Sequence, residues 1–195
     1  MSSATSEHEP FASPGPAWAE QHPDDWWRAS QAAIREAVAA SGVAPSAIKA
    51  VGFSGQMHGA VMLDARDRVV RPAIIWCDQR SARECEWINR TVGAARVLEH
   101  TSNPALPNFT LTKLLWVREH EPELYARIRH VMLPKDYVRF RLSGERAIDV
   151  ADASGTLMLD VAGRRWSKPM LDACGIPIEW LPTVVESPEI GRAHV

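Results

Sequence analysis

The sequence predicts an α/β fold, because short apolar runs typical of buried strands alternate with stretches that carry helix signals. Residues 48–53 form one such apolar run, and it ends at the glycine-flanked segment 54–59, SGQMHG. A second apolar run at 73–75 leads directly into the polar cluster 76–80, WCDQR. Ligands of α/β proteins bind at the ends of strands, so we expect these two segments to contribute side chains to one pocket.

The other elements follow from local signals along the chain. Pro23 begins a helix, Asp24 and Asp25 lie in its first turn, where they interact favourably with the helix dipole, and Gly42 ends it. Its apolar face is expected to carry Trp27, Ile34 and Val38. A strand is expected over 48–54, a hairpin over 60–64 and 69–76 and a strand over 130–133, with helices over 81–89, 111–119, 122–127, 135–143 and 167–173.

The segment 54–59 is the first candidate ligand site. Gly55 and Gly59 allow a small ligand to approach the backbone closely. Gln56 and His58 supply hydrogen-bond donors and acceptors, and Met57 supplies an adaptable apolar wall. This combination suits a small, hydroxyl-rich molecule. The alternative is a tight turn in which His58 only satisfies nearby backbone groups.

Several motifs occur in an order that resembles the FGGY family of carbohydrate kinases, most closely its xylulokinase branch. They are SGQMHG at 54–59, RPAIIWCDQR at 71–80, NFTLTKLLWVREHEPE at 108–123, LPKDYVRFRLSGE at 133–145 and DASGTLMLDV at 152–161. The pair Met57-His58 is the most discriminating element, because glycerol kinases carry Arg-Glu at the matching place. The resemblance covers roughly residues 9–189 and rests on several motifs together.

The resemblance implies an RNase H-like fold of the actin and Hsp70 type, in which two domains enclose ATP. This chain would be a truncated N-terminal domain without the first phosphate-binding hairpin and without the second domain, since no Asp-x-Gly-Thr motif occurs near Met1. The implied reaction is ATP-dependent phosphorylation of D-xylulose to D-xylulose 5-phosphate with Mg²⁺. No catalytic residue is expected in this chain, because the family's aspartate would lie beyond Val195, and neither ATP nor Mg²⁺ is expected to bind this fragment well.

The resemblance also implies a set of substrate-binding residues. They are Gln56, Met57, His58, Trp76, Asp78 and Asn108. Asn108 departs from the family pattern before the Lys-Leu-x-Trp signature, which leaves the choice of sugar open. Asp78 and Arg80 either pair with each other or orient sugar hydroxyls. Asp149 and Asp152 resemble a paired-carboxylate site, but a structural Asx-turn is preferred.

The two ends of the sequence carry separate expectations. Residues 1–16 are rich in Ser, Pro and Glu and are expected to form a mobile arm before the domain of residues 17–189. Residues 190–195, IGRAHV, match what a widely used sequencing adapter encodes in one reading frame, so a non-native tail is expected there. The alternative is a native strand that starts at 189–191.

Composition narrows the function classes. The formal net charge is −2 at pH 7 in 195 residues, which gives no electrostatic argument for binding nucleic acid or membranes. Cys77, Cys85 and Cys174 lack the spacing of a zinc site and indicate reduced thiols, so a cytoplasmic protein is expected. The partner is expected to be a small-molecule sugar, and a homodimer is one assembly considered for the full-length enzyme. Two alternatives stay open: another FGGY kinase acting on a related polyol, ketose or sugar acid, and a non-catalytic sugar-binding module.

Overall fold

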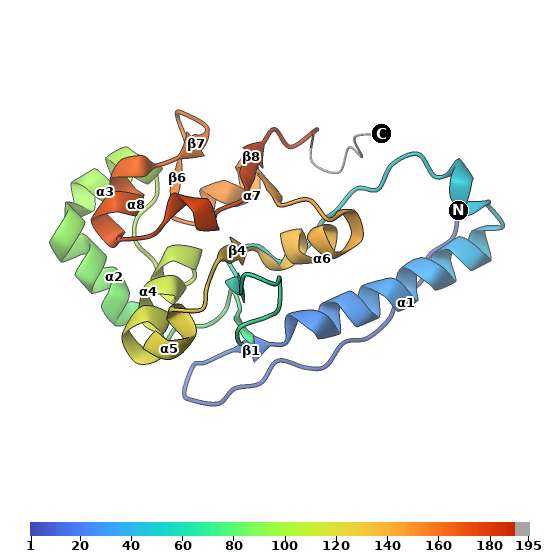
Figure 1. Cartoon of the computed structure of the whole chain (residues 1–195), viewed down its shortest axis with the longest axis horizontal. Helices are drawn as coiled ribbons and strands as arrows, with labels where there is room; N and C mark the ends of the chain where they lie inside the picture. The colour runs from blue at the N-terminus through green and yellow to red at the C-terminus, as the bar shows by residue number, and fades with distance from the viewer. Residues whose placement is uncertain (190–195) are drawn as a thin grey trace.

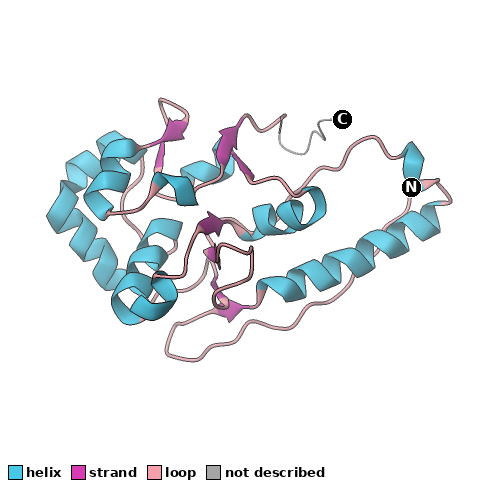
Figure 2. Ribbon diagram, in the orientation of Figure 1, coloured by secondary structure: helices cyan, strands magenta, loops and turns pink. Residues whose placement is uncertain are grey.

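The structure is a computed structural model and describes residues 1–189 (Figure 1). Its helices are α1 (Pro23–Ser41), α2 (Ala82–Ile88), α3 (Ala94–Thr101), α4 (Thr110–His120), α5 (Pro122–Tyr125), α6 (Pro134–Ser143), α7 (Val150–Ser154) and α8 (Lys168–Cys174), with short turns η1 (Pro45–Ala47), η2 (Asn89–Gly93) and η3 (Ile178–Trp180). Its strands are β1 (Glu20–Gln21), β2 (Val61–Leu63), β3 (Ala73–Ile74), β4 (His130–Met132), β5 (Ala147–Asp149), β6 (Leu159–Asp160), β7 (Arg165–Trp166) and β8 (Thr183–Val185). Figure 2 shows that the strands are short and that helices surround them.

An antiparallel ladder joins the first four strands. β1 pairs with β3 and β2 pairs with β4, while a bridge between Ala60 and Ile74 connects the two pairs. A further bridge from Leu63 to Val69 closes the hairpin, and the Asp64 amide donates to the Arg68 carbonyl at its turn. The predicted hairpin is therefore confirmed. β5 pairs with β8 in parallel, and β6 pairs with β7 in antiparallel orientation.

The ladder separates two apolar cores, because successive side chains of a strand point to opposite faces. Ala60, Met62 and Ile74 belong to the core formed with α2, α3, α4 and α8. The residues between them, such as Val61 and Leu63, belong to the core formed with α1 and α6. Burial on both faces explains why these short runs are apolar throughout.

Most predicted helices are confirmed to within one or two residues. Gly42 ends α1 in the left-handed conformation at φ 67°, as its position suggested. None of the three side chains predicted for the buried face of α1 is fully buried: Trp27 and Val38 are half-buried, and Ile34 is 40% exposed because the second half of α1 extends away from the main body (Figure 1). The buried residues of the helix include Trp26 and Ala29 instead. The sequence prediction did not include α3 or α7.

The prediction of a strand over residues 48–54 is wrong. These residues have no regular secondary structure, and the backbone of residues 49–55 makes no hydrogen bond with any part of residues 1–189. A β-strand needs a neighbour to pair with, and here the run has none within the described chain. The run has the apolar composition of a strand, but within residues 1–189 no neighbouring strand pairs with its backbone.

The N-terminal residues run beside α1 (Figure 1). Ser2 Oγ donates to the carbonyl of Ala37 at 2.8 Å, and Ala12 pairs with Glu20. The structure thus gives the path of the expected arm, while its mobility stays a prediction. The proposed tail at 190–195 lies outside the described residues.

Candidate functional site

His58 is held in place from three sides. Its backbone adopts φ 65°, a left-handed conformation that costs a non-glycine residue about 1–3 kcal/mol and persists only where the surroundings enforce it. Its carbonyl accepts hydrogen bonds from Thr110 Oγ1 at 3.1 Å and from Lys113 Nζ at 3.2 Å. Its ring lies edge-on to Phe109, with ring centroids 5.3 Å apart. These contacts hold both the backbone and the imidazole in one orientation.

The tautomer of the His58 ring follows from its partner. Nδ1 lies 2.7 Å from the carbonyl oxygen of Gly155. A carbonyl oxygen can only accept, so Nδ1 must carry the proton. The neutral ring therefore has its lone pair on Nε2, which can accept a hydrogen bond from a hydroxyl group. The ring is half-buried, so part of it remains accessible.

Gly155 lets the pair Met57-His58 approach the end of α7. A Cβ atom at this position would lie 2.5 Å from His58 Cε1 and 2.7 Å from Met57 Cε, closer than real Cβ contacts. Met57 also packs beside the small core of Leu133, Ile148, Ala153 and Leu159. In the sequence, Gly155 was noted only as part of the motif at 152–161. In the structure, Met57 and His58 both pack closely against Gly155.

Lys113 is the site residue that the sequence analysis missed. Its side chain is fully buried on α4, and its amine donates to the carbonyls of His58 and Asn108. Burial lowers the pKa of Lys113 to about 7, and the nearby Asp78 carboxylate opposes this shift. The available signal was a lysine inside the apolar run 111–117, LTKLLWV, where a charged residue needs a specific reason.

Gln56 and Asn108 have different surroundings. The amide nitrogen of Gln56 donates to Gln21 Oε1 at 3.1 Å, so this side chain turns toward β1 and away from His58. Asn108 is half-buried, and its carbonyl shares the Lys113 amine with the carbonyl of His58. The structure therefore brings His58, Met57 and the backbone of Asn108 together around Lys113 and Gly155.

Asp78 and Trp76 do not join this group as open ligand-binding side chains. Asp78 is fully buried; its carboxylate accepts from the Ala19 amide at 2.6 Å and from Arg80 Nη2 at 2.7 Å. Arg80 in turn lies over the Trp18 ring, 4.0 Å from its centroid. The pair of Asp78 with Arg80, one of the two expected alternatives, is present and Asp78 is fully buried, while a role of Asp78 in sugar binding stays a prediction. Trp76 is 54% exposed at the surface.

Four charged side chains gather where α6 meets α7. Lys135 Nζ lies 2.6 Å from both Asp149 Oδ1 and Asp152 Oδ2, and 3.4 Å from Asp136 Oδ1. Asp149 also accepts from the amides of Ala151 and Asp152 and caps α7, which confirms the Asx-type role expected for it. Asp136 is fully buried without a hydrogen bond to either oxygen, and burial raises its pKa to about 7.

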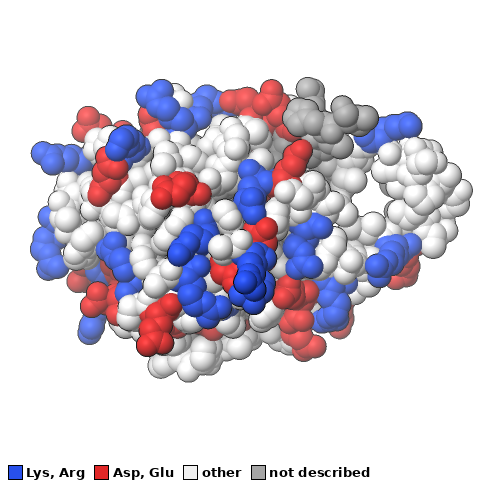
Figure 3. All heavy atoms as spheres, viewed as in Figure 1, with Lys and Arg blue, Asp and Glu red and all other residues white. Residues whose placement is uncertain are grey.

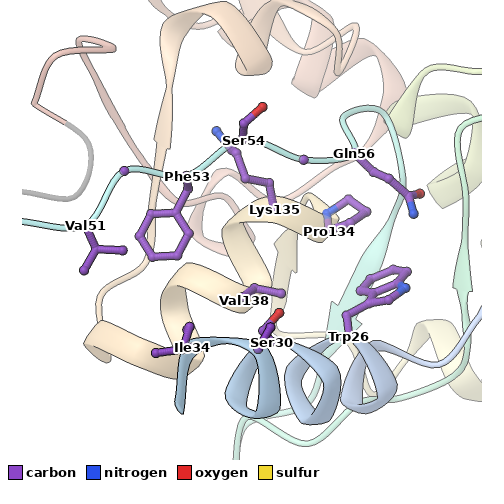
Figure 4. Close-up of a pocket in the computed structure, with 13 residues that line it drawn as sticks. Trp26, Ser30, Ile34, Val51, Phe53, Ser54, Gln56, Pro134, Lys135 and Val138 are labelled. Carbon is purple, nitrogen blue, oxygen red and sulfur yellow. The ribbon is translucent and has the colours of Figure 1, made fainter. Parts of the chain in front are cut away.

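A cavity of about 430 Å³ lies beside this cluster. Figure 4 shows Trp26, Ser30 and Ile34 of α1 on one side and the segment carrying Val51 and Phe53 on the other, with side chains of α6 between them. Aromatic and aliphatic groups dominate the lining, which does not suit a hydroxyl-rich ligand. Figure 3 shows a gap through the molecule on its right side. In the same view of Figure 1, α1 lies below this gap and the segment that follows α1 lies above it.

Within residues 1–189 no three His, Cys, Asp or Glu side chains are grouped in a way that could hold a metal ion. No helix in the same range has the length and apolar character needed to cross a membrane. On the face shown in Figure 3, positive and negative side chains are interspersed.

Comparison with known proteins places the chain among sugar kinases. A family model described as the N-terminal domain of the FGGY family of carbohydrate kinases matches residues 1–193. The xylulose kinase of Escherichia coli (strain K12) is 48% identical over 182 residues, which are 92% of this chain and 36% of the relative. The chain therefore spans about a third of the length of the curated relatives that it matches.

The chain also resembles solved structures of sugar kinases. The structure of a xyloylose kinase from Brucella ovis matches with a TM-score of 0.88 at 43% identity, over 94% of this chain and 38% of that protein. A gluconate kinase from Lactobacillus acidophilus matches with a TM-score of 0.83 at 26% identity, over 90% of this chain and 35% of that protein. The predicted fold class is confirmed: the chain is a partial α/β domain of the actin and Hsp70 type found in these kinases.

Proposed function

Because the chain belongs to the FGGY family of carbohydrate kinases, we propose that the complete enzyme transfers the γ-phosphoryl group of ATP to the terminal hydroxyl of D-xylulose. The product would be D-xylulose 5-phosphate. This chain would contribute the side that holds the sugar. Relatives named as xylulose kinases, matched over nine-tenths of the chain, support the choice of substrate.

The observation that carries the proposal is the fixed orientation of His58. Its Nδ1 proton is committed to Gly155, so Nε2 is presented as an acceptor for a sugar hydroxyl. Met57 beside it offers an apolar surface to the carbon face of the sugar. A preorganised acceptor next to an apolar wall is the combination that a small sugar needs, because its hydroxyls must find partners once they leave water.

The chemistry of the transfer requires groups that we place elsewhere in the complete enzyme. ATP supplies the phosphoryl group, Mg²⁺ neutralises charge on the phosphates, and an aspartate outside this chain accepts the hydroxyl proton. Phosphoryl transfer needs the donor, the metal and the acceptor in line. We therefore expect no xylulose phosphorylation by the 195-residue chain alone.

A second candidate is a related FGGY kinase that acts on a sugar acid. Two observations favour it: Asn108 departs from the family pattern, and the gluconate kinase of Lactobacillus acidophilus matches with a TM-score of 0.83. Asn108 precedes Phe109, whose ring lies edge-on to the His58 ring, and we propose on this ground that Asn108 affects the choice of sugar. Substrate profiling separates the two candidates.

The test is a chimeric enzyme in which this chain replaces the matching 182 residues of the Escherichia coli xylulose kinase. We expect ATP-dependent formation of xylulose phosphate by the chimera and none by the isolated chain. A folded chimera that phosphorylates gluconate but not xylulose would support the second candidate. A folded chimera inactive on all sugars tested would contradict both.

Two smaller proposals concern the setting of the complete enzyme. Cys77, Cys85 and Cys174 are all free thiols in the structure, and free, partly buried thiols fit a reducing compartment, which supports a cytoplasmic location. A homodimer of the complete enzyme stays a prediction, to be checked by sedimentation of the chimera.

A further inference from the structure

Lys113 carries a buried amine whose hydrogen bonds all go to the candidate sugar site. The side chain is fully buried, and its Nζ donates to two main-chain carbonyls, those of His58 and Asn108. Burying an amine in the middle of an apolar helix is costly, and helix α4 already buries Leu111, Leu114 and Val117 around it. Packing alone would be served as well by methionine or leucine. The position therefore calls for a reason beyond packing.

The two carbonyls belong to separate segments that nothing in the local sequence brings together. His58 follows the extended segment before β2, and Asn108 lies 50 residues later, just before α4. The only amine that donates to both, among the described residues, is that of Lys113. It thereby sets the spacing between the two segments at the place where the sugar is expected.

The hydrogen bond to His58 also acts on its strained backbone. The backbone of His58 has a left-handed φ of 65°, and its carbonyl accepts hydrogen bonds from Lys113 and Thr110 of α4. With this carbonyl fixed, the imidazole can reach Gly155 with Nδ1 and leave Nε2 free. Loss of the amine would free the carbonyl of Asn108 and leave Thr110 as the single donor to His58.

We propose that Lys113 is a positioning residue for the sugar: its amine fixes His58 and Asn108 relative to each other without contacting the substrate. The inference rests on the proposed function, since it assigns a task at the same site. It is compatible with either protonation state of the amine, because a neutral amine still has two N–H groups for the two carbonyls. Since Lys113 is fully buried, it has no surface of its own to offer a ligand.

The test uses the chimeric kinase and the substitution Lys113→Met, which keeps the length of the side chain and removes the donors. We expect the KM for xylulose to rise about tenfold, the change expected when one hydrogen bond to a bound ligand is misplaced, while the KM for ATP stays within about twofold of the parent. The matched control is Leu114→Ala on the same helix, which opens a cavity in the apolar core and lowers the melting temperature but should leave the KM for xylulose unchanged.

The outcomes separate this inference from the proposed function. A parent chimera that folds but does not use xylulose would remove the proposed function. An active parent with an unchanged KM in Lys113→Met, or with the same KM rise in Leu114→Ala, would overturn the role of Lys113 alone. If Lys113→Met does not fold, Thr110→Val removes the other donor to the His58 carbonyl and should raise the KM for xylulose by a few-fold. An unchanged KM there would also overturn the inference.

Discussion

The Nδ1 nitrogen of His58 lies 2.7 Å from the carbonyl oxygen of Gly155, 97 residues further along the chain. This hydrogen bond joins the loop before β2 to the C-terminal end of α7. It fixes the imidazole tautomer, and the missing side chain of Gly155 is what gives the ring room to make it. The orientation of the His58 ring therefore depends on Gly155, and a substitution at each of the two residues tests the site separately.

Gly155→Ala should weaken sugar binding by displacing the pair Met57-His58. The new methyl group would lie 2.5 Å from His58 Cε1 and 2.7 Å from Met57 Cε, so both side chains must move. We expect the KM for xylulose in the chimera to rise at least tenfold. The matched control is Gly52→Ala, where a Cβ meets nothing within 4 Å. Equal KM values for the two variants would show that Gly155 does not shape the site.

His58→Ala should lower catalytic efficiency on xylulose by one to two orders of magnitude. The substitution removes a hydrogen bond to a buried hydroxyl, a loss of roughly 1–3 kcal/mol in transition-state binding. Steady-state kinetics of the chimera provide the measurement, and His130→Ala at the partly exposed start of β4 serves as a histidine control. An unchanged catalytic efficiency in His58→Ala would show that His58 is only a turn residue and does not bind the sugar.

Asp136 should make folding stability fall as pH rises from about 4 to about 7. Burial raises the pKa of this carboxyl to about 7, so in that interval the folded protein binds a proton that the unfolded chain has already released. The stabilising effect of the protonated form is complete below pH 4 and is lost as pH rises through 7. Lys135, Asp152 and Arg139 are the charged groups that act on Asp136.

The substitution Asp136→Asn tests this dependence. Thermal melts of the chimera from pH 4 to pH 8 should show a flatter profile for Asp136→Asn, with greater stability than the parent at pH 8 by on the order of 1–3 kcal/mol. Asp172→Asn makes the same charge change at an exposed site on α8 and should leave the profile of the parent intact. A parallel pair of profiles for Asp136→Asn and the parent would contradict the assignment.

The segment 49–55 should make the 195-residue chain self-associate. Its backbone has no hydrogen-bond partner within residues 1–189; its Val51 side chain is 42% exposed, and that of the preceding Ile48 is 43% exposed. An apolar segment with open backbone groups favours pairing with another chain. Sedimentation velocity at tens of micromolar should therefore show oligomers or aggregates.

A charge on this segment should reduce the association. We expect Val51→Lys to shift the chain toward monomer, because a lysine on an unpaired edge opposes strand pairing. Leu98→Lys places the same charge at another exposed apolar side chain, on α3, and should have little effect. A monomeric parent that unfolds cooperatively would contradict the expectation and indicate an independently stable module.

Local signals in the sequence were enough to predict most of the helices and the apolar runs of β2 and β3. The proline at the start of α1, Gly42 at its end, and the apolar runs of β2 and β3 are local signals, and local backbone preferences act on them directly. The motif order was enough to indicate the family, and the glycine-flanked segment around Met57 and His58 was enough to indicate a site. These features need no knowledge of distant residues.

Which candidate residues meet depends on how the elements pack in three dimensions. The sequence left Asp78 with either a ligand-binding role or a pairing with Arg80, and only packing shows that the two side chains meet in the interior. The run 48–54 has the composition of a strand, but strand formation depends on a neighbour that supplies hydrogen bonds, and composition cannot provide one. Lys113 and Gly155 acquire their roles from contacts across 55 and 97 residues with His58. Such contacts depend on how the elements pack, because a buried polar group is stabilised only by the partner that folding brings to it.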